Sequence, residues 1–108
     1  MIDDFKKLAL RLGLILEAGR VPKIEKLLKF KVQVGHEERI IVSGSAKHYA
    51  PEDLLGQTVV IVANLAPAKL MGITSQGMIL CASDKSGADE ILSALTTLAP
   101  LPSGLKVS

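Results

Sequence analysis

The sequence predicts an all-β fold, a five-stranded barrel with one short helix between strands 3 and 4 and with N- and C-terminal extensions. Apolar and polar residues alternate with a period of two through much of residues 8–43, which is typical of half-buried strands. A continuous β-branched run follows at residues 59–63. The 108 residues contain no Gly/Ser-rich linker, so we expect one domain over residues 1–108.

The first two strands are predicted from the alternation. In the first, leucines occupy every even position from Leu8 to Leu16, so we expect these leucines to face the core together. The turn-prone residues 19–23 come next. In the second strand the positions expected to face the core are Leu28, Phe30, Val32 and Val34. The outer face of this strand is then basic, because Lys29 and Lys31 lie between them.

The remaining elements follow in order. Residues 39–44 form a third, more buried strand that ends at a glycine. A short helix is expected at residues 51–56, with Pro51 in its first turn, acidic residues near its positive end and Gly56 at its close. Residues 59–63 and 78–82 are the fourth and fifth strands, and Cys81 is expected to be an inert thiol buried in the fifth.

This order of elements, over about residues 6–84, is that of an OB-fold. The second and third strands of an OB-fold and two of its loops bind oligonucleotides and oligosaccharides. Residues 85–108 then form an apolar extension beyond the barrel.

The composition and the absence of certain motifs exclude several classes of function. Apolar residues make up 48% of the chain and the mean hydropathy is +0.36, which favours an oligomer. No apolar run approaches the roughly 20 residues that cross a bilayer, so we expect a cytoplasmic protein without a membrane partner. One cysteine and two histidines show no metal-ligand spacing, and no nucleophile motif or phosphate-binding loop is present. We therefore expect no metal, no cofactor and no catalytic activity in this chain alone.

The basic residues are concentrated rather than numerous. The net charge is only +2, yet seven lysines and arginines fall between positions 20 and 47. If the even-numbered residues of strand two face the core, Lys29 and Lys31 form an outer platform, and we expect Arg39 and Ser43 on the same face of strand three. Lys26 adds a positive charge in the first loop.

Residues 64–78 read NLAPAKLMGITSQGM and are expected to form a polar binding loop between two apolar strands. Its candidate contacts are Asn64, Lys69, Ser75, Gln76 and Met78. The loop closely resembles the signature N-L-x-P-x-K-L-x-G-x-x-S-x-G-M of the tRNA-binding domain that is appended to methionyl-tRNA synthetases or found free-standing in bacteria.

The resemblance covers most of the chain and implies an OB-fold that binds the outer corner of tRNA without sequence specificity. It places Lys26, Ser43, Asn64, Lys69, Ser75, Gln76 and Met78 on the binding surface. It also implies support of aminoacylation, as an appended or free-standing module, with the catalytic body of methionyl-tRNA synthetase as a further partner. The complete candidate surface, with the platform included, is Lys26, Lys29, Lys31, Arg39, Ser43, Asn64, Lys69, Ser75, Gln76 and Met78.

The extension at residues 85–108 has two interpretations. In the family the corresponding segment pairs two subunits, so the resemblance implies a homodimer joined through this segment. Alternatively, the apolar residues 91–107 fold back onto their own barrel.

Two other functions stay open. The related export-chaperone branch has the same fold and dimer, so a chaperone-like or other protein-interaction role is the alternative. The first loop also departs from the family pattern, because Ile24 and Glu25 replace the usual Ala-Asp before Lys26. Oligosaccharide binding ranks third, because only three aromatic residues are present.

Overall fold

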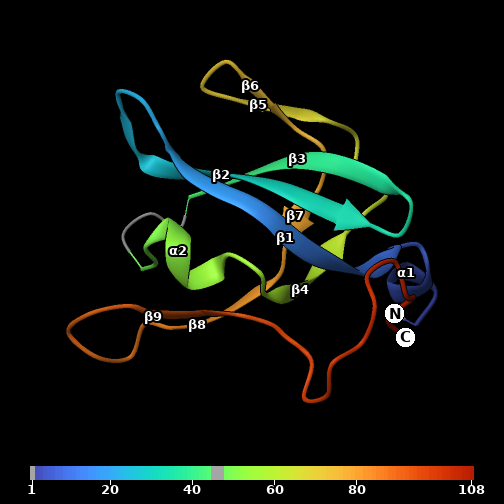
Figure 1. Ribbon diagram of the computed structural model, residues 1–108. Coiled ribbons are helices and arrows are strands. Elements are labelled where there is room, and N and C mark those ends of the chain that lie inside the picture. The colour runs from blue at the N-terminus through green and yellow to red at the C-terminus, as the bar shows by residue number, and fades with distance from the viewer. Residues whose placement is uncertain (1, 45–47) are drawn as a thin grey trace.

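The computed structural model describes residues 2–44 and 48–108 (Figure 1). Lys47, which the sequence places in the basic segment, lies outside the described residues. The elements are α1 (Ile2–Lys6), β1 (Leu10–Val21), β2 (Ile24–Val34), β3 (Glu37–Ser43), α2 (Pro51–Leu54), β4 (Thr58–Val62), β5 (Ala68–Leu70), β6 (Ile73–Ser75), β7 (Met78–Ile79), β8 (Cys81–Asp84) and β9 (Ile91–Ala94). No helix in the described part of the chain is long and apolar enough to cross a membrane.

The main sheet confirms the all-β prediction and its five strands. Its order is β3-β2-β1-β4-β7 with antiparallel neighbours, and the predicted short helix, α2, lies between β3 and β4 in the chain. Among the described residues, the edge strands β3 and β7 share no backbone ladder, so the expected closed barrel is not formed. Contacts from the segment between β6 and β7 bridge that gap, including the Gln76 N–H donating to the Ile40 carbonyl over 2.8 Å.

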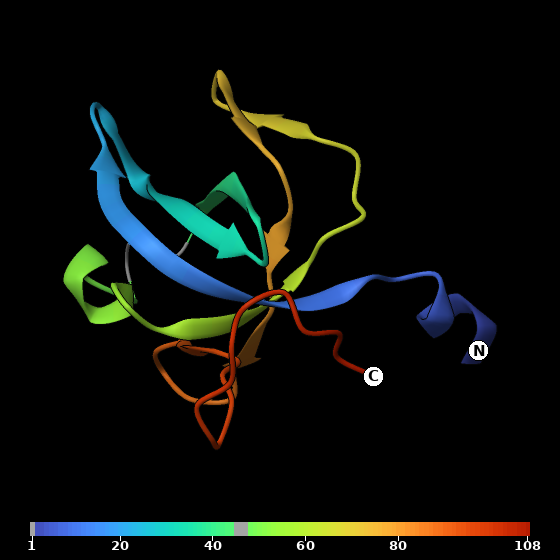
Figure 2. The same ribbon diagram turned by 45° about the vertical axis from the view of Figure 1, so that its right-hand side comes forward.

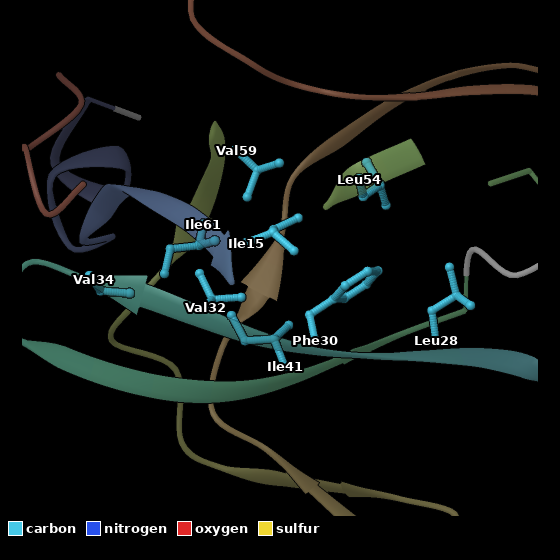
Figure 3. Packing of buried hydrophobic residues seen from close by; sticks show 9 residues of the cluster. All are labelled: Ile15, Leu28, Phe30, Val32, Val34, Ile41, Leu54, Val59 and Ile61. Atoms are coloured by element: carbon cyan, nitrogen blue, oxygen red, sulfur yellow. The ribbon is translucent and has the colours of Figure 1, made fainter. Parts of the chain in front are cut away.

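The main core lies inside the curved sheet (Figure 3). Phe30 and Val32 of β2 are fully buried, as the sequence predicts, and they pack with Ile41 of β3 and Ile61 of β4. Leu54 of α2 covers the same cluster.

The predicted orientation of the first strand was wrong. Ile15, not the leucines, enters the main core, whereas Leu10 and Leu12 join Val60 and Val62 in a second cluster. Gly13 and Ile15 of β1 therefore point inward, because Leu12 lies opposite Val60 on β4 and shares its face. The register shift between Ile15 and Glu17 then turns Ala18 towards the core further along the strand. Both faces of β1 and β4 are apolar, so the alternation alone could not show which face is the inner one.

The tail covers the second cluster and confirms the interpretation in which the chain folds back on itself. The Leu12 N–H donates to the Leu105 carbonyl at 2.9 Å, and the Gly104 N–H donates to the Leu12 carbonyl at 2.7 Å. The Val107 N–H reaches the Leu10 carbonyl at 2.9 Å. The tail thus occupies the edge of β1 beyond its pairing with β2, which begins at Leu14. Figure 2 shows it passing beneath the main sheet.

The predicted fifth strand is divided in two. Only Met78 and Ile79 join the main sheet as β7, whereas Cys81 begins β8, which pairs with β9 in a separate hairpin. Cys81 is exposed, so the prediction of a buried core thiol was wrong. All four residues of β8 are exposed, so the apolar character of residues 78–82 did not mark one continuous buried strand.

Candidate functional site

The outer face of β2 carries the predicted basic platform, but its two lysines differ. Lys29 is exposed and has no ion-pair partner among the described residues, whereas Lys31 lies 3.3 Å from both Glu17 and Glu38. Hydrogen bonds to Glu17 and Glu38, with their negative charges, raise the pKa of Lys31. Most of the positive charge that this face presents to a ligand therefore comes from Lys29 rather than Lys31.

Arg39 and Ser43 do not lie on that face, so this part of the prediction was wrong. Arg39 is directly opposite Val32 and Ser43 is opposite Leu28, and both of those partners belong to the core-facing row of β2. The prediction failed because the register of β3 against β2 cannot be read from β3 alone.

Arg39 instead fixes the open side of the sheet. Its guanidinium donates to the Glu37 carboxylate at 2.9 Å and to the backbone carbonyls of Ala63 and Gln76. The two carbonyls flank residues 64–75, so Arg39 holds together both ends of the segment that contains the signature sequence.

The signature sequence, predicted as a loop, forms a β-hairpin. β5 pairs with β6 in the register Ala68–Ser75, Lys69–Thr74 and Leu70–Ile73, leaving Met71 and Gly72 as a two-residue turn. Both turn residues have positive φ, 50° and 88°, which is the pattern of a type I′ hairpin turn. Lys69 is exposed on β5 and has no ion-pair partner in the described part of the chain.

Side chains anchor this hairpin to β3. The buried Ser75 hydroxyl accepts a hydrogen bond from the Val42 N–H at 3.0 Å and donates one to the Gly77 carbonyl at 3.1 Å. The Gln76 side-chain oxygen accepts from the Ile40 N–H at 3.0 Å. The hairpin is therefore held to an unpaired edge strand by side chains as well as by its backbone.

Asn64 and Met78 mark the two ends of the segment. Asn64 accepts a hydrogen bond from the Ala9 N–H at 2.8 Å and donates one to the Lys7 carbonyl at 2.6 Å, so it joins the end of β4 to the start of β1. Met78 is 53% exposed, and it lies on the same side of the sheet as Val62.

The tips of two hairpins meet at a groove that sequence reasoning did not identify. The β1–β2 and β5–β6 hairpins project from the same end of the molecule (Figure 2), and the groove between their tips is lined by Lys23, Ile24, Glu25, Lys26 and Met71. Lys26 is the predicted site residue of this set. The sequence does contain a signal for a hairpin turn at Met71. Two short strand-like triplets are separated there by only two residues, Met71 and Gly72.

A second groove connects with the platform. It runs over the outer face of β1 and β2, where Arg20 and Lys29 lie on its lining with Glu17 and Lys31. Of the ten predicted site residues, Lys26, Lys29 and Lys69 are exposed cations, whereas Arg39, Asn64, Ser75 and Gln76 hold the ends of the hairpin segment in place. Within the described residues, no group of His, Cys, Asp and Glu is arranged to hold a metal ion.

Comparison with protein families identifies a match over nearly the whole chain. Residues 10–104 fit a family described as "Putative tRNA binding domain". The methionine-tRNA ligase of Thermotoga maritima is 52% identical over 107 residues, which are 99% of this chain and 16% of the ligase. The chain therefore spans only a small part of the curated relatives that it matches.

Solved structures support the same relationship. A protein from Pyrococcus horikoshii described as related to methionyl-tRNA synthetase has a TM-score of 0.91 and 34% identity, covering 100% of this chain and 96% of that one. The chaperone CsaA of Bacillus anthracis has a TM-score of 0.87 and 28% identity, covering 100% of this chain and 97% of its own.

Proposed function

The chain belongs to the tRNA-binding domain family, and from this premise we propose that it binds folded tRNA without recognising a particular sequence. The observation that carries the proposal is a set of three exposed lysines: Lys26 and Lys29 on β2 of the main sheet, and Lys69 on β5 of the separate β5–β6 hairpin. None of the three has an ion-pair partner among the described residues. Lysines of this kind are free to contact phosphate, the dominant charge on RNA.

Recognition by shape follows from the shortage of aromatic platforms. Phe30 is fully buried, and the Tyr49 hydroxyl bonds to the backbone of β9 through Leu92 and Ala94. Since neither of these two rings is free for stacking, phosphate and ribose contacts dominate, as in the recognition of structured RNA. The five-stranded sheet, its connecting hairpins and its basic outer face fit an OB-fold used for this purpose.

The residues of the predicted surface are proposed to have different roles. Exposed Lys26, Lys29, Lys69 and Met78 are proposed to contact RNA directly. Buried or bonded side chains are proposed to hold the binding hairpin in position, and these are Arg39, Asn64, Ser75 and Gln76. Ser43 is half-buried at the end of β3, and we keep it as a proposed contact at the edge of the sheet. Lys31 forms ion pairs with Glu17 and Glu38, so we propose that it contributes less to RNA binding than Lys29 does.

The biological setting is proposed from the relatives. Since the curated relatives are methionine-tRNA ligases that the chain covers only in part, we propose that it supports aminoacylation as an appended or free-standing module of such a ligase. It would raise the local concentration of tRNA near the catalytic body, and it needs no catalytic residue for this. The proposal places the protein in the cytoplasm, where tRNA is charged.

We also propose a homodimer. Exposed apolar side chains are concentrated in the N-terminal segment and in the tail; they include Ile2, Leu8, Ile91, Leu95, Leu98, Leu101 and Leu105. Ile2 and Leu8 line one groove with Val107, beside Lys6, Lys106 and Ser108, so apolar side chains of the two terminal regions lie together in a groove with a basic border. A surface of this kind is typical of an interface, and two copies would present two basic surfaces to one RNA.

The proposal is tested by titrating the 108-residue chain with unfractionated tRNA and with duplex RNA of similar length at two salt concentrations. Preferential binding of tRNA that weakens steeply with salt supports it. Equal affinity for both RNAs would show that tRNA shape is not recognised.

A chaperone-like function is the second candidate, favoured by the similarity to CsaA over the whole chain. The same exposed apolar surface would then receive unfolded segments of other proteins. Suppression of aggregation of a denatured client, combined with no measurable tRNA binding, would favour this second function.

A further inference from the structure

Two residues with unusual backbone conformations meet at one place in the fold. Among the described residues, Lys23 at φ 67° and Met71 at φ 50° are the only non-glycine residues with positive φ. They lie 48 positions apart in the sequence, at the tips of the β1–β2 and β5–β6 hairpins, and both line the groove between those tips. Backbone strain of this kind concentrates at binding sites.

Turn chemistry alone does not explain these two residues. Met71 takes the first position of the type I′ turn, where asparagine, aspartate and glycine are favoured. Lys23 takes the second position of the two-residue turn that joins Val21 to Ile24, after Pro22, where glycine is favoured. Each turn thus carries a long side chain where a smaller residue would fold more easily.

The groove combines apolar and positive side chains. Met71 is 69% exposed, a large apolar surface for a hairpin tip, and Ile24 lies beside it in the lining. Lys23 and Lys26 carry the positive charges, and Glu25 is the one carboxylate among the lining residues. The groove thus offers an apolar contact, two cations and one acceptor within a small area.

We propose that the two hairpin tips form a clamp for one unstacked nucleotide of the bound RNA. In this clamp Met71 and Ile24 contact the face of the base, and Lys23 and Lys26 contact the flanking phosphates. Glu25 accepts a hydrogen bond from an exocyclic amino group of the base. The inference rests on the proposed tRNA binding and extends it by naming a base contact and the residues that make it.

The clamp distinguishes RNA from a peptide by charge. A peptide segment without acidic residues would use the apolar contact but gain little from two lysines at the groove, whereas a nucleotide uses both. Folded tRNA contains loops in which single bases leave the stack, and proteins that read RNA contact such bases.

The decisive variant is Met71→Asn, which restores the favoured residue of a type I′ turn. We expect a melting temperature equal to or above that of the wild type, because the backbone strain in the turn is relieved. We expect tRNA affinity to fall about three- to tenfold, because an apolar contact is lost. The dependence of log K on log salt should stay unchanged, since no charge is removed. Met71→Gly provides a second variant with the same expectation for binding.

Lys23→Gly is the complementary variant. It should also preserve folding, but it should weaken binding together with a decrease in the salt slope of about 0.7–0.9 for one phosphate contact. Leu55→Asn is the control, because Leu55 is 52% exposed at the end of α2 and does not line the groove. Chemical probing of tRNA bases should reveal a position that the wild type protects and that the Met71→Asn protein leaves reactive.

The outcomes separate the clamp from the proposed function. If the wild type binds no tRNA, the proposed function fails first. If the wild type binds tRNA and both Met71 variants bind it with wild-type affinity, the clamp is refuted and tRNA binding stands. Loss of affinity for an unfolded peptide in Met71→Asn, with tRNA affinity unchanged, would also overturn the assignment to RNA.

Discussion

The Ser75 hydroxyl accepts a hydrogen bond from the Val42 N–H over 3.0 Å, and this bond joins β6 to the edge strand β3. The hydroxyl also donates to the Gly77 carbonyl, so one small side chain satisfies a backbone group on each side. Ser75 is the one buried polar residue of the described chain, at 4% exposure. The serine of the signature sequence therefore has a structural task whether or not it touches RNA.

Ser75→Ala should destabilise the fold by about 1–3 kcal/mol, because the Val42 N–H loses its partner in a buried setting. Chemical denaturation measures the change. Thr74→Ala, one residue away and exposed, is the matched control and should change the free energy of unfolding by less than about 0.5 kcal/mol. Equal stabilities for the two variants would show that the hydroxyl does not anchor the hairpin.

Lys69→Ala should weaken tRNA binding without affecting folding, because Lys69 is exposed and has no ion-pair partner among the described residues. A loss of about 1 kcal/mol, roughly fivefold in Kd, is expected, with a smaller salt slope. Lys85→Ala is the control, since Lys85 is also exposed but lies between β8 and β9, beside Glu90. Parallel losses in both variants would indicate attraction by overall charge instead of a site.

Gly104→Ala should release the tail from β1. Gly104 has φ +90°, and a Cβ there would lie 2.7 Å from the Gly35 Cα, which is backbone and cannot turn away. We expect a loss of about 1–3 kcal/mol and faster amide exchange at Leu12, whose N–H bonds to Leu105. Gly19→Ala is the control, because no atom lies within 4 Å of its added Cβ. Unchanged exchange at Leu12 would mean that the tail docks without Gly104.

Leu98→Asp should convert the proposed dimer to a monomer with an intact fold. Leu98 has an exposed fraction of 108%, so a charge there costs the single chain almost nothing, but it would be buried in an interface. Light scattering reports the mass and circular dichroism the fold. Leu55→Asp should remain a dimer. A wild type that is monomeric at micromolar concentration would refute the interface itself.

The ion pairs of Lys31 should respond to alkaline pH. Because the pKa of Lys31 is raised by Glu17 and Glu38, its contribution to stability is complete below its ordinary value of 10.5 and is lost as pH rises through the folded-state pKa. Glu38→Gln should lower that pKa, as followed by NMR of the lysine side chain. A titration of Lys31 that does not move in this variant would exclude the pairing in solution.

The sequence predicted most elements correctly but not how they face one another. Alternation located β1 and β2, an apolar run that ends at a glycine located β3, and proline with two acidic residues located α2. The inner face of β1 was assigned wrongly, because both of its faces bury apolar residues, one of them beneath the tail. The position of Arg39 depended on the register between β2 and β3, which is set by pairing over the whole hairpin.

The candidate site, too, could be predicted from the sequence only in part. Exposed lysines such as Lys26 and Lys69 could be predicted from sequence, since a lysine between turn residues or on an outer face stays solvated. The hydrogen bonds of Asn64 and Ser75 reach partners 55 and 33 positions away, so only the fold reveals them. The groove at Met71 required two hairpins from distant parts of the chain to meet.

The central claim is that exposed lysines on β2 and on the β5–β6 hairpin bind folded tRNA, and one titration tests it most directly. The wild-type chain and its Lys26→Ala/Lys69→Ala double variant are titrated with unfractionated tRNA across a range of salt concentrations. We predict that wild-type affinity falls linearly with log salt, and that the double variant binds more weakly with a slope smaller by about 1.4–1.8, the sum for two phosphate contacts. Identical slopes for the two proteins, or binding that does not depend on salt, would contradict the claim.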